Sequence, residues 1–152
     1  MTTLERAAGA VRLTRMRWWH VPAVMVLEGE LFGAEAWSAA AYWSELAETA
    51  TRRYVVAVDG GEVVGYAGLA VFGDEAHVLT LGVAGAAQGR GLGGTLLRDL
   101  LAAAGDRRVL LDVRADNEVA QRLYRRHGFV PVGRRRRYYR PSGVDAVVMA
   151  RG

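Results

Sequence analysis

The chain has 152 residues, 51% of them hydrophobic and 24% charged, with a formal net charge of +4, values typical of one soluble globular domain. No apolar run approaches the ~20 residues of a membrane span and no secretory signal is recognisable, so we expect a cytoplasmic protein. The absence of cysteine excludes disulfides, thiolate metal sites and a cysteine nucleophile, and three scattered histidines (His20, His77 and His127) give no reason to expect a metal.

The N-terminal segment combines an irregular start with two helices. Residues 1–10 are small and polar, and we expect a flexible tail there. After a first strand, Pro22 suits the first turn of a helix that ends near Gly33. Ser38 is an N-cap signal for a second helix, which extends to about Ala47.

Runs rich in β-branched and apolar residues predict the strands of a sheet. They are Val11–Met16, Tyr54–Asp59, Glu62–Phe72, Glu75–Val83, Val109–Val113 and a closing pair, Phe129–Tyr139 and Val144–Ala150. Gly60-Gly61 is a strong hairpin signal, and Gly73-Asp74 turns the chain again. The second, third and fourth runs therefore form an antiparallel meander.

A glycine-dense loop, Gln88–Gly94, runs directly into a strongly amphipathic helix that extends to about Ala104. Because glycine has no Cβ, the loop can turn sharply and its N–H groups can approach a bulky anion. The first N–H groups of the helix have no internal partners and lie at the positive end of its dipole, which favours phosphate. The loop also satisfies the G-x-G-x-x-G pattern of dinucleotide-binding folds, but it does not follow its strand at once and comes after antiparallel hairpins, which weakens that alternative.

A last helix is predicted from about Asn117 to His127, capped by Asp116 and ended by Gly128. The strands on either side of the glycine-loop helix are joined by a crossover and should be parallel neighbours. The fold class is therefore α/β of the α+β type, in a single domain over residues 11–152. We expect a mixed, mostly antiparallel sheet of six to seven strands with a central parallel pair and about four flanking helices.

Three segments together, LTLGVAGAAQGRGLGGTLL, LLDVRADN and AQRLYRRHGFVPVG, resemble the GCN5-related N-acetyltransferase (GNAT) family. Gln88, Gly91 and Gly93 match its signature of Gln or Arg, two residues, Gly, one residue, and Gly or Ala. The resemblance implies an acetyl-CoA-dependent N-acetyltransferase, in which the loop holds the pyrophosphate and the two parallel strands splay apart to admit the pantetheine arm. Within the family the chain is most similar to the ribosomal-protein-alanine (RimI-like) type, on Trp37-Ser38, Leu81-Gly82-Val83, Val113-Arg114-Ala115 and Arg137-Tyr138-Tyr139.

The resemblance also assigns roles to residues. The implied acetyl-CoA-binding residues are Leu81, Gly82, Val83, Gln88, Gly89, Arg90, Gly91, Leu92, Gly93, Gly94 and Asn117. Tyr124 is the implied catalytic acid, and Trp37, Tyr138 and Tyr139 are expected around the acceptor. Asp112 stands where the family has a glutamate as general base, and its shorter side chain leaves open a direct role, a water-mediated role or none. The implied acceptor is a protein N-terminus, such as that of a ribosomal protein with a small first residue.

The residues alone leave alternatives to these roles. Tyr124 also fits a core position on the apolar stripe of its helix, and Asp112 equally fits an ion pair with a nearby arginine. The acceptor is alternatively a small amine, a polyamine or a lysine side chain. The basic cluster Arg134–Arg140 is compatible with a non-catalytic module that senses acyl-CoA or contacts RNA, although a solvated strand face or pocket rim is favoured. No contact with a membrane is expected.

Overall fold

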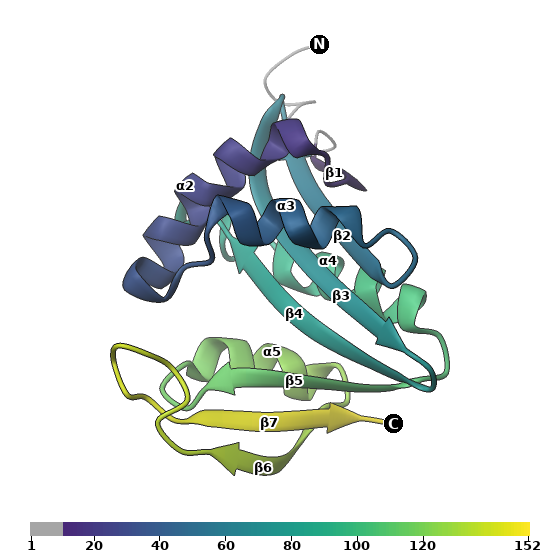
Figure 1. The fold of residues 1–152 in the computed structure, drawn as a ribbon, viewed down its shortest axis with the longest axis vertical. Helices are drawn as coiled ribbons and strands as arrows, with labels where there is room; N and C mark the ends of the chain where they lie inside the picture. The colour runs from purple at the N-terminus through teal and green to yellow at the C-terminus, as the bar shows by residue number, and fades with distance from the viewer. Residues whose placement is uncertain (1–10) are drawn as a thin grey trace.

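The computed structural model of the protein describes residues 11–152, so the predicted tail of residues 1–10 lies outside the described residues. Seven strands form one sheet in the order β1-β2-β3-β4-β5-β7-β6 (Figure 1). They are β1 (Val11–Arg15), β2 (Arg52–Asp59), β3 (Glu62–Phe72), β4 (Glu75–Val83), β5 (Arg108–Arg114), β6 (Val130–Arg135) and β7 (Ala146–Arg151). Among the strands of residues 11–152, only β4 and β5 are parallel, which confirms the predicted mixed sheet with its central parallel pair.

In the described part of the chain four α-helices flank the sheet, as predicted. They are α2 (Val21–Phe32), α3 (Ala39–Ala47), α4 (Leu92–Ala104) and α5 (Glu118–Arg126), with short 3-10 turns at η1 (Trp18–His20), η2 (Gly33–Glu35) and η3 (Gly85–Ala87). Helices α2 and α3 cover one face of the β2–β4 region, and α4 covers the opposite face (Figure 1). Helix α4 therefore forms the crossover that connects the parallel neighbours β4 and β5, as expected.

The ends of two helices depend on side-chain caps. The Ser38 hydroxyl accepts a hydrogen bond from a first-turn N–H of α3 at 3.1 Å, as predicted. The prediction of Asp116 as the cap of α5 was wrong, because Asn117 is the N-cap and its side chain accepts from the Ala120 N–H at 3.1 Å. The Asp116 carboxylate instead accepts two hydrogen bonds from Arg114, at 3.0 and 3.1 Å.

Strand β6 is shorter than the predicted run to Tyr139, because it ends at Arg135. The chain turns at Arg137, whose φ of 49° is left-handed. The Tyr139 N–H then donates to the Val144 carbonyl at 3.1 Å. Tyr138 and Tyr139 therefore lie in a loop and not in a strand.

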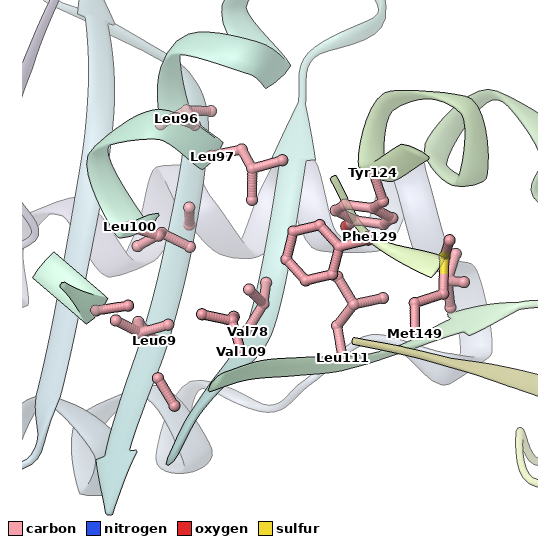
Figure 2. Packing of buried hydrophobic residues seen from close by; sticks show 14 of the residues in the cluster. Leu69, Val78, Leu96, Leu97, Leu100, Val109, Leu111, Tyr124, Phe129 and Met149 are labelled. Carbon is pink, nitrogen blue, oxygen red and sulfur yellow. The ribbon is translucent and has the colours of Figure 1, made fainter. Parts of the chain in front are cut away.

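Two hydrophobic clusters lie on opposite faces of the sheet. Figure 2 shows the first, in which Leu96, Leu97 and Leu100 of α4 pack with residues of β3, β4 and β5. Tyr124 and Phe129 extend this cluster towards α5 and β7. The second cluster joins α2 and α3 to the other face, and it surrounds one buried charged residue, Glu28. The leucine stripe of α4 was recognisable from its spacing, and it faces the sheet as predicted.

The parallel pair separates soon after it begins. Strands β4 and β5 pair only over Glu75–Val78 and Arg108–Leu111, although β4 continues to Val83 and β5 to Arg114. A bulge in β4 marks the separation, because the register with β3 shifts so that Leu79 has no partner. Beyond it, the backbone groups of β4 that point towards β5 have no strand partner. The two strands thus form a wedge, and the cavities described next lie in and beside it.

Candidate active site

The glycine loop reaches α4 through two residues of left-handed backbone. Gly89 and Gly91 have φ of +84° and +77°, values that side chains other than glycine adopt only with strain. Gly91 is the N-cap of α4 and has no side-chain cap. The first intrahelical bond runs from the Thr95 N–H to the Gly91 carbonyl, so the N–H groups of residues 92–94 have no partner within the helix. This end of α4 is built to accept an anion.

A groove of about 630 Å³ lies beside this loop, within the range of ~300–1,000 Å³ typical of small-molecule sites. Its walls include Leu81, Gly82, Val83, Gln88, Gly89, Gly91, Leu92, Gly93, Gly94 and Asn117, together with Leu31, Phe32, Val119, Ala120, Leu123 and Arg126. The structure therefore brings together all the predicted acetyl-CoA-binding residues except Arg90. The Arg90 guanidinium lies 3.6 Å from the Asp59 carboxylate and does not line the groove.

The glycines keep this groove open. A Cβ at Gly82 would lie 2.7 Å from the Tyr66 ring and 2.9 Å from Leu31, so a larger residue there would have to displace these side chains. A Cβ at Gly93 would lie 3.2 Å from Leu123 on the facing wall. Gln88, part of the predicted signature, donates through its side-chain amide to the Val83 carbonyl at 3.0 Å and so fixes the loop to the end of β4. The groove suits a ligand that carries phosphates at one end and a narrow chain along its length.

A second, inner cavity of about 140 Å³ opens between the separated strands. It is lined by Val78–Leu81 of β4, Leu111–Arg114 of β5, Tyr124 of α5, and residues Glu28, Phe32, Glu35, Trp37, Asn117, Ala120 and Tyr139. The inner cavity shares Phe32, Leu81, Asn117 and Ala120 with the groove, so the two lie side by side. Both predicted catalytic residues, Asp112 and Tyr124, line this cavity.

Tyr124 combines a packed ring with a hydroxyl near open space. The residue is 7% exposed, and its ring packs edge-on against Phe129 with centroids 5.8 Å apart (Figure 2). Within residues 11–152 its hydroxyl makes no hydrogen bond to another side chain. Burial raises the pKa of Tyr124 to about 12, so the phenol keeps its proton at neutral pH. The core position and the proposed acid are therefore compatible.

Asp112 lines the inner cavity and is also ion-paired. Its Oδ1 atom accepts a hydrogen bond from the Arg135 Nε at 3.0 Å. The Arg135 guanidinium lies over the Tyr138 ring, 5.7 Å from its centroid. The ion-pair interpretation of Asp112 is thus confirmed as geometry, and the pairing holds the carboxylate at the edge of the cavity.

The residues expected around the acceptor line a recess that shares residues with the inner cavity but none with the glycine groove. Trp37, Tyr138 and Tyr139 line a further recess of about 270 Å³, which also includes Asp112 and Arg135. Trp37 and Tyr139 border the inner cavity as well. A molecule in this recess would therefore reach the inner cavity beside Asp112, away from the groove.

Two glutamates at the cavity escaped the sequence reasoning. Glu35 lies in η2 and binds both the Arg114 guanidinium and the Ser142 hydroxyl. Hydrogen bonding from Ser142, and then from Arg114, lowers the pKa of Glu35. Arg114 thereby links the connection before α3 to the loop before β7. Glu28 carried a visible signal, because it is a charged residue on the apolar face of a predicted helix.

Two arginines of the basic cluster, Arg134 and Arg135, form ion pairs within the protein. Arg134 donates to the Asp145 carboxylate at 2.8 Å, and Arg135 binds Asp112 as described. These contacts favour the interpretation of a pocket rim. Within residues 11–152 there is no group of three or more His, Asp or Glu side chains placed to hold a metal ion. None of the helices in that part of the chain is long and apolar enough to cross a membrane.

Comparisons with known proteins agree with this geometry. The profile of the Acetyltransferase (GNAT) family matches residues 13–129. Over 130 residues the chain is 50% identical to the N-alpha-acetyltransferase RimI of Mycobacterium tuberculosis, with 82% of each chain covered. The crystal structure of the ribosomal-protein-S18-alanine N-acetyltransferase from Escherichia coli superposes with a TM-score of 0.83 at 29% identity, covering 93% of this chain and 92% of that one. Ard1 from Thermoplasma volcanium gives a TM-score of 0.81 at 25% identity, over 93% and 97% of the two chains.

Proposed function

The chain belongs to the acetyltransferase (GNAT) family, and on that premise we propose that it transfers the acetyl group of acetyl-CoA to the α-amine of a protein N-terminus. The observation that carries this proposal is the adjacency of the glycine-lined groove and the inner cavity with Tyr124 and Asp112. The names of its relatives support the acceptor class, because the Mycobacterium tuberculosis protein is called an N-alpha-acetyltransferase and the Escherichia coli enzyme a ribosomal-protein-S18-alanine N-acetyltransferase.

The glycine groove is the place for the donor. We assign the pyrophosphate to the free N–H groups at the start of α4, since backbone donors and the helix dipole favour anions there. Leu81–Val83 and Asn117 would then lie along the pantetheine arm, where the groove meets the inner cavity. The side-chain oxygen of Asn117 caps α5, which leaves the side-chain NH₂ free to donate to the ligand. Acetyl-CoA supplies the acyl group as a thioester.

The chemistry requires a neutral amine, a polarised carbonyl and a protonated leaving thiol. Unpaired N–H groups of β4 beyond the bulge can donate to the carbonyl oxygen as it gains negative charge. The C–N bond forms as the C–S bond breaks, and Tyr124 gives its proton to the departing sulfur. The nitrogen loses one proton in the same reaction, to Asp112 or to water, and Tyr124 regains its own from solvent. A phenol with a pKa of about 12 is fully protonated before the reaction, as this role requires.

The paired, short carboxylate of Asp112 favours an N-terminal amine over a lysine amine. An α-amine has a pKa of about 8 and a lysine side chain one of about 10.4, so at pH 7 about a tenth of the first and under about a thousandth of the second is neutral. Asp112, which is paired with Arg135 or acts through water, is a weak base. It therefore suits the α-amine, because a larger fraction of this acceptor is already neutral. Trp37, Tyr138 and Tyr139 line the recess through which the peptide would approach.

A single peptide tests the proposal. It begins with alanine, contains one internal lysine, and is incubated with acetyl-CoA and the enzyme while thiol release is followed. Fragmentation by mass spectrometry then locates the acetyl group. We expect modification of the α-amine, whereas acetylation mainly on lysine, or turnover only with small amines or polyamines, would refute the N-terminal assignment in favour of those acceptors.

A further inference from the structure

Glu28 is a charged residue at the centre of the buried face of α2. It is 1% exposed and lies on the same face as Val24 and Leu27, which belong to the core. Its side chain lines the inner cavity with Tyr124 and Asp112. A buried carboxylate is costly unless it is hydrogen-bonded, and the roles assigned so far give it no function.

Three neutral donors hold the Glu28 carboxylate. The Tyr42 hydroxyl donates to Oε1 at 2.5 Å, and the Tyr66 hydroxyl donates to the same oxygen at 3.1 Å. The backbone N–H of Trp37 donates to Oε2 at 3.0 Å. Burial, together with the neighbouring Glu28 carboxylate, raises the pKa of both tyrosines, so they remain neutral donors. A carboxylate offers about four acceptor positions, and three donors leave one of them.

The other two carboxylates of the cavity each have an arginine. Glu35 is paired with Arg114, and Asp112 is paired with Arg135 at 3.0 Å. Among residues 11–152, no arginine or histidine forms an ion pair with Glu28. Glu28 is therefore the carboxyl group of the inner cavity that has no arginine or histidine partner among the described residues.

We propose that Glu28 binds the acceptor amine, its remaining acceptor position taking a hydrogen bond from the α-ammonium group. This inference rests on the proposed function and extends it to one residue. At pH 7 about nine-tenths of an α-amine with a pKa of about 8 is protonated, so the acceptor binds as an ammonium ion and gives up one proton before its nitrogen attacks the thioester. The acetylated product is an uncharged amide and loses this interaction, which favours its release.

The experiment compares a short peptide that begins with alanine with the same peptide in which hydrogen replaces the α-amino group. Dissociation constants are measured by calorimetry in the presence of CoA, which permits binding without transfer. The parent enzyme should bind the amine peptide about 10- to 100-fold more tightly, the size of a hydrogen bond to a charged group. In Glu28→Gln this ratio should fall close to one, while the affinity for the des-amino peptide is unchanged.

Glutamine suits the Glu28 site. Its amide oxygen can accept from the backbone N–H of Trp37, while its NH₂ donates to the hydroxyl oxygens of Tyr42 and Tyr66. Tyr66→Phe is the matched control, since it removes one donor but keeps the charge and should preserve the ratio. Equal weakening of both peptides by Glu28→Gln would make the residue structural and overturn the proposal. So would a parent enzyme that does not prefer the amine peptide.

A variant outside α2 keeps the inference testable if Glu28→Gln fails to fold. In Asp112→Asn the preference for the amine peptide should persist. If the preference disappeared, Asp112 and not Glu28 would be the residue that binds the amine. Failure of the inference is separable from failure of the proposed function. An enzyme that acetylates the α-amine without preferring the amine peptide in binding refutes only the role of Glu28.

Discussion

Replacing Tyr124 with phenylalanine removes a single oxygen atom from the wall of the inner cavity. The ring keeps its edge-on contact with Phe129 and its place in the core. Within residues 11–152 the Tyr124 hydroxyl forms no hydrogen bond to another side chain, so its removal leaves no side chain without a hydrogen-bond partner. An isosteric change of this kind should alter the free energy of unfolding by less than about 1.5 kcal/mol. At about 2–4 °C per kcal/mol for a domain of this size, the melting temperature should shift by only a few degrees.

The expected loss in turnover is far larger than the loss in stability. Removing a general acid typically lowers the rate about 10²- to 10⁴-fold, which corresponds to about 2.7–5.4 kcal/mol of transition-state stabilisation. The affinity for acetyl-CoA should stay near that of the parent, because the proton is shared only as the C–S bond breaks. We would measure kcat by thiol release, acetyl-CoA affinity by calorimetry and stability by thermal unfolding.

The pH profile provides an independent check on Tyr124. Its pKa is raised, so the protonated form that donates is retained below about 12 and only about 0.1% of it is lost at pH 9. In the parent enzyme the rate should therefore rise with pH as the α-amine deprotonates, with no fall caused by Tyr124 up to pH 9. A Tyr124→Phe variant whose kcat stays within about threefold of the parent would reduce the residue to packing and refute the reasoning.

Three further substitutions separate the groove, the base and the fold. Gly91→Glu, at φ +77° beside the free N–H groups of α4, should abolish acetyl-CoA binding in calorimetry; Gly105→Glu, at φ +63° at the other end of α4, is the control and should leave binding intact. Asp112→Asn should lower kcat/KM at pH 7 by about 10²-fold and recover part of it at higher pH, whereas Asp112→Glu should keep or improve activity; equal rates for all three enzymes would remove Asp112 from the mechanism. Ser38→Ala should cost about 1 kcal/mol in thermal unfolding through loss of the α3 cap, and an equal cost for the exposed Ser44→Ala would contradict that explanation.

The parts of the protein that the sequence predicts well have local causes. The α4 stripe is visible because its leucines recur at helical spacing, and the hairpin between β2 and β3 because two adjacent glycines turn the chain. The glycine loop was recognisable for the same reason, since a positive φ at Gly89 and Gly91 requires that residue type. Each of these features depends on neighbours within a few positions.

The parts that escaped depend on partners far apart in the chain. Arg114 meets Glu35 across 79 positions, and Arg135 meets Asp112 across 23. No spacing rule relates such pairs in a chain with many arginines, so the sequence left Asp112 open between a base and an ion pair. Arg90 is a related case, because the motif does not indicate that its guanidinium lies beside Asp59 and outside the groove lining, and its role in binding stays a prediction. The cavity is assembled by the fold, and its charges could not be paired without it.

The strand order has a consequence for synthesis of the chain. Strands β1 to β4 lie in the sheet in the order in which they are made, so each finds its neighbour already present. Strand β7 follows β6 in the chain but lies between β5 and β6, and within residues 11–152 no other strand pairs with β6. On the ribosome, β6 therefore emerges before its partner strand and can pair only after β7 (residues 146–151) has been synthesised. The half of the sheet that precedes the glycine loop can form its ladder during translation, whereas the half that carries Asp112 and Arg135 closes only after β7 has left the exit tunnel.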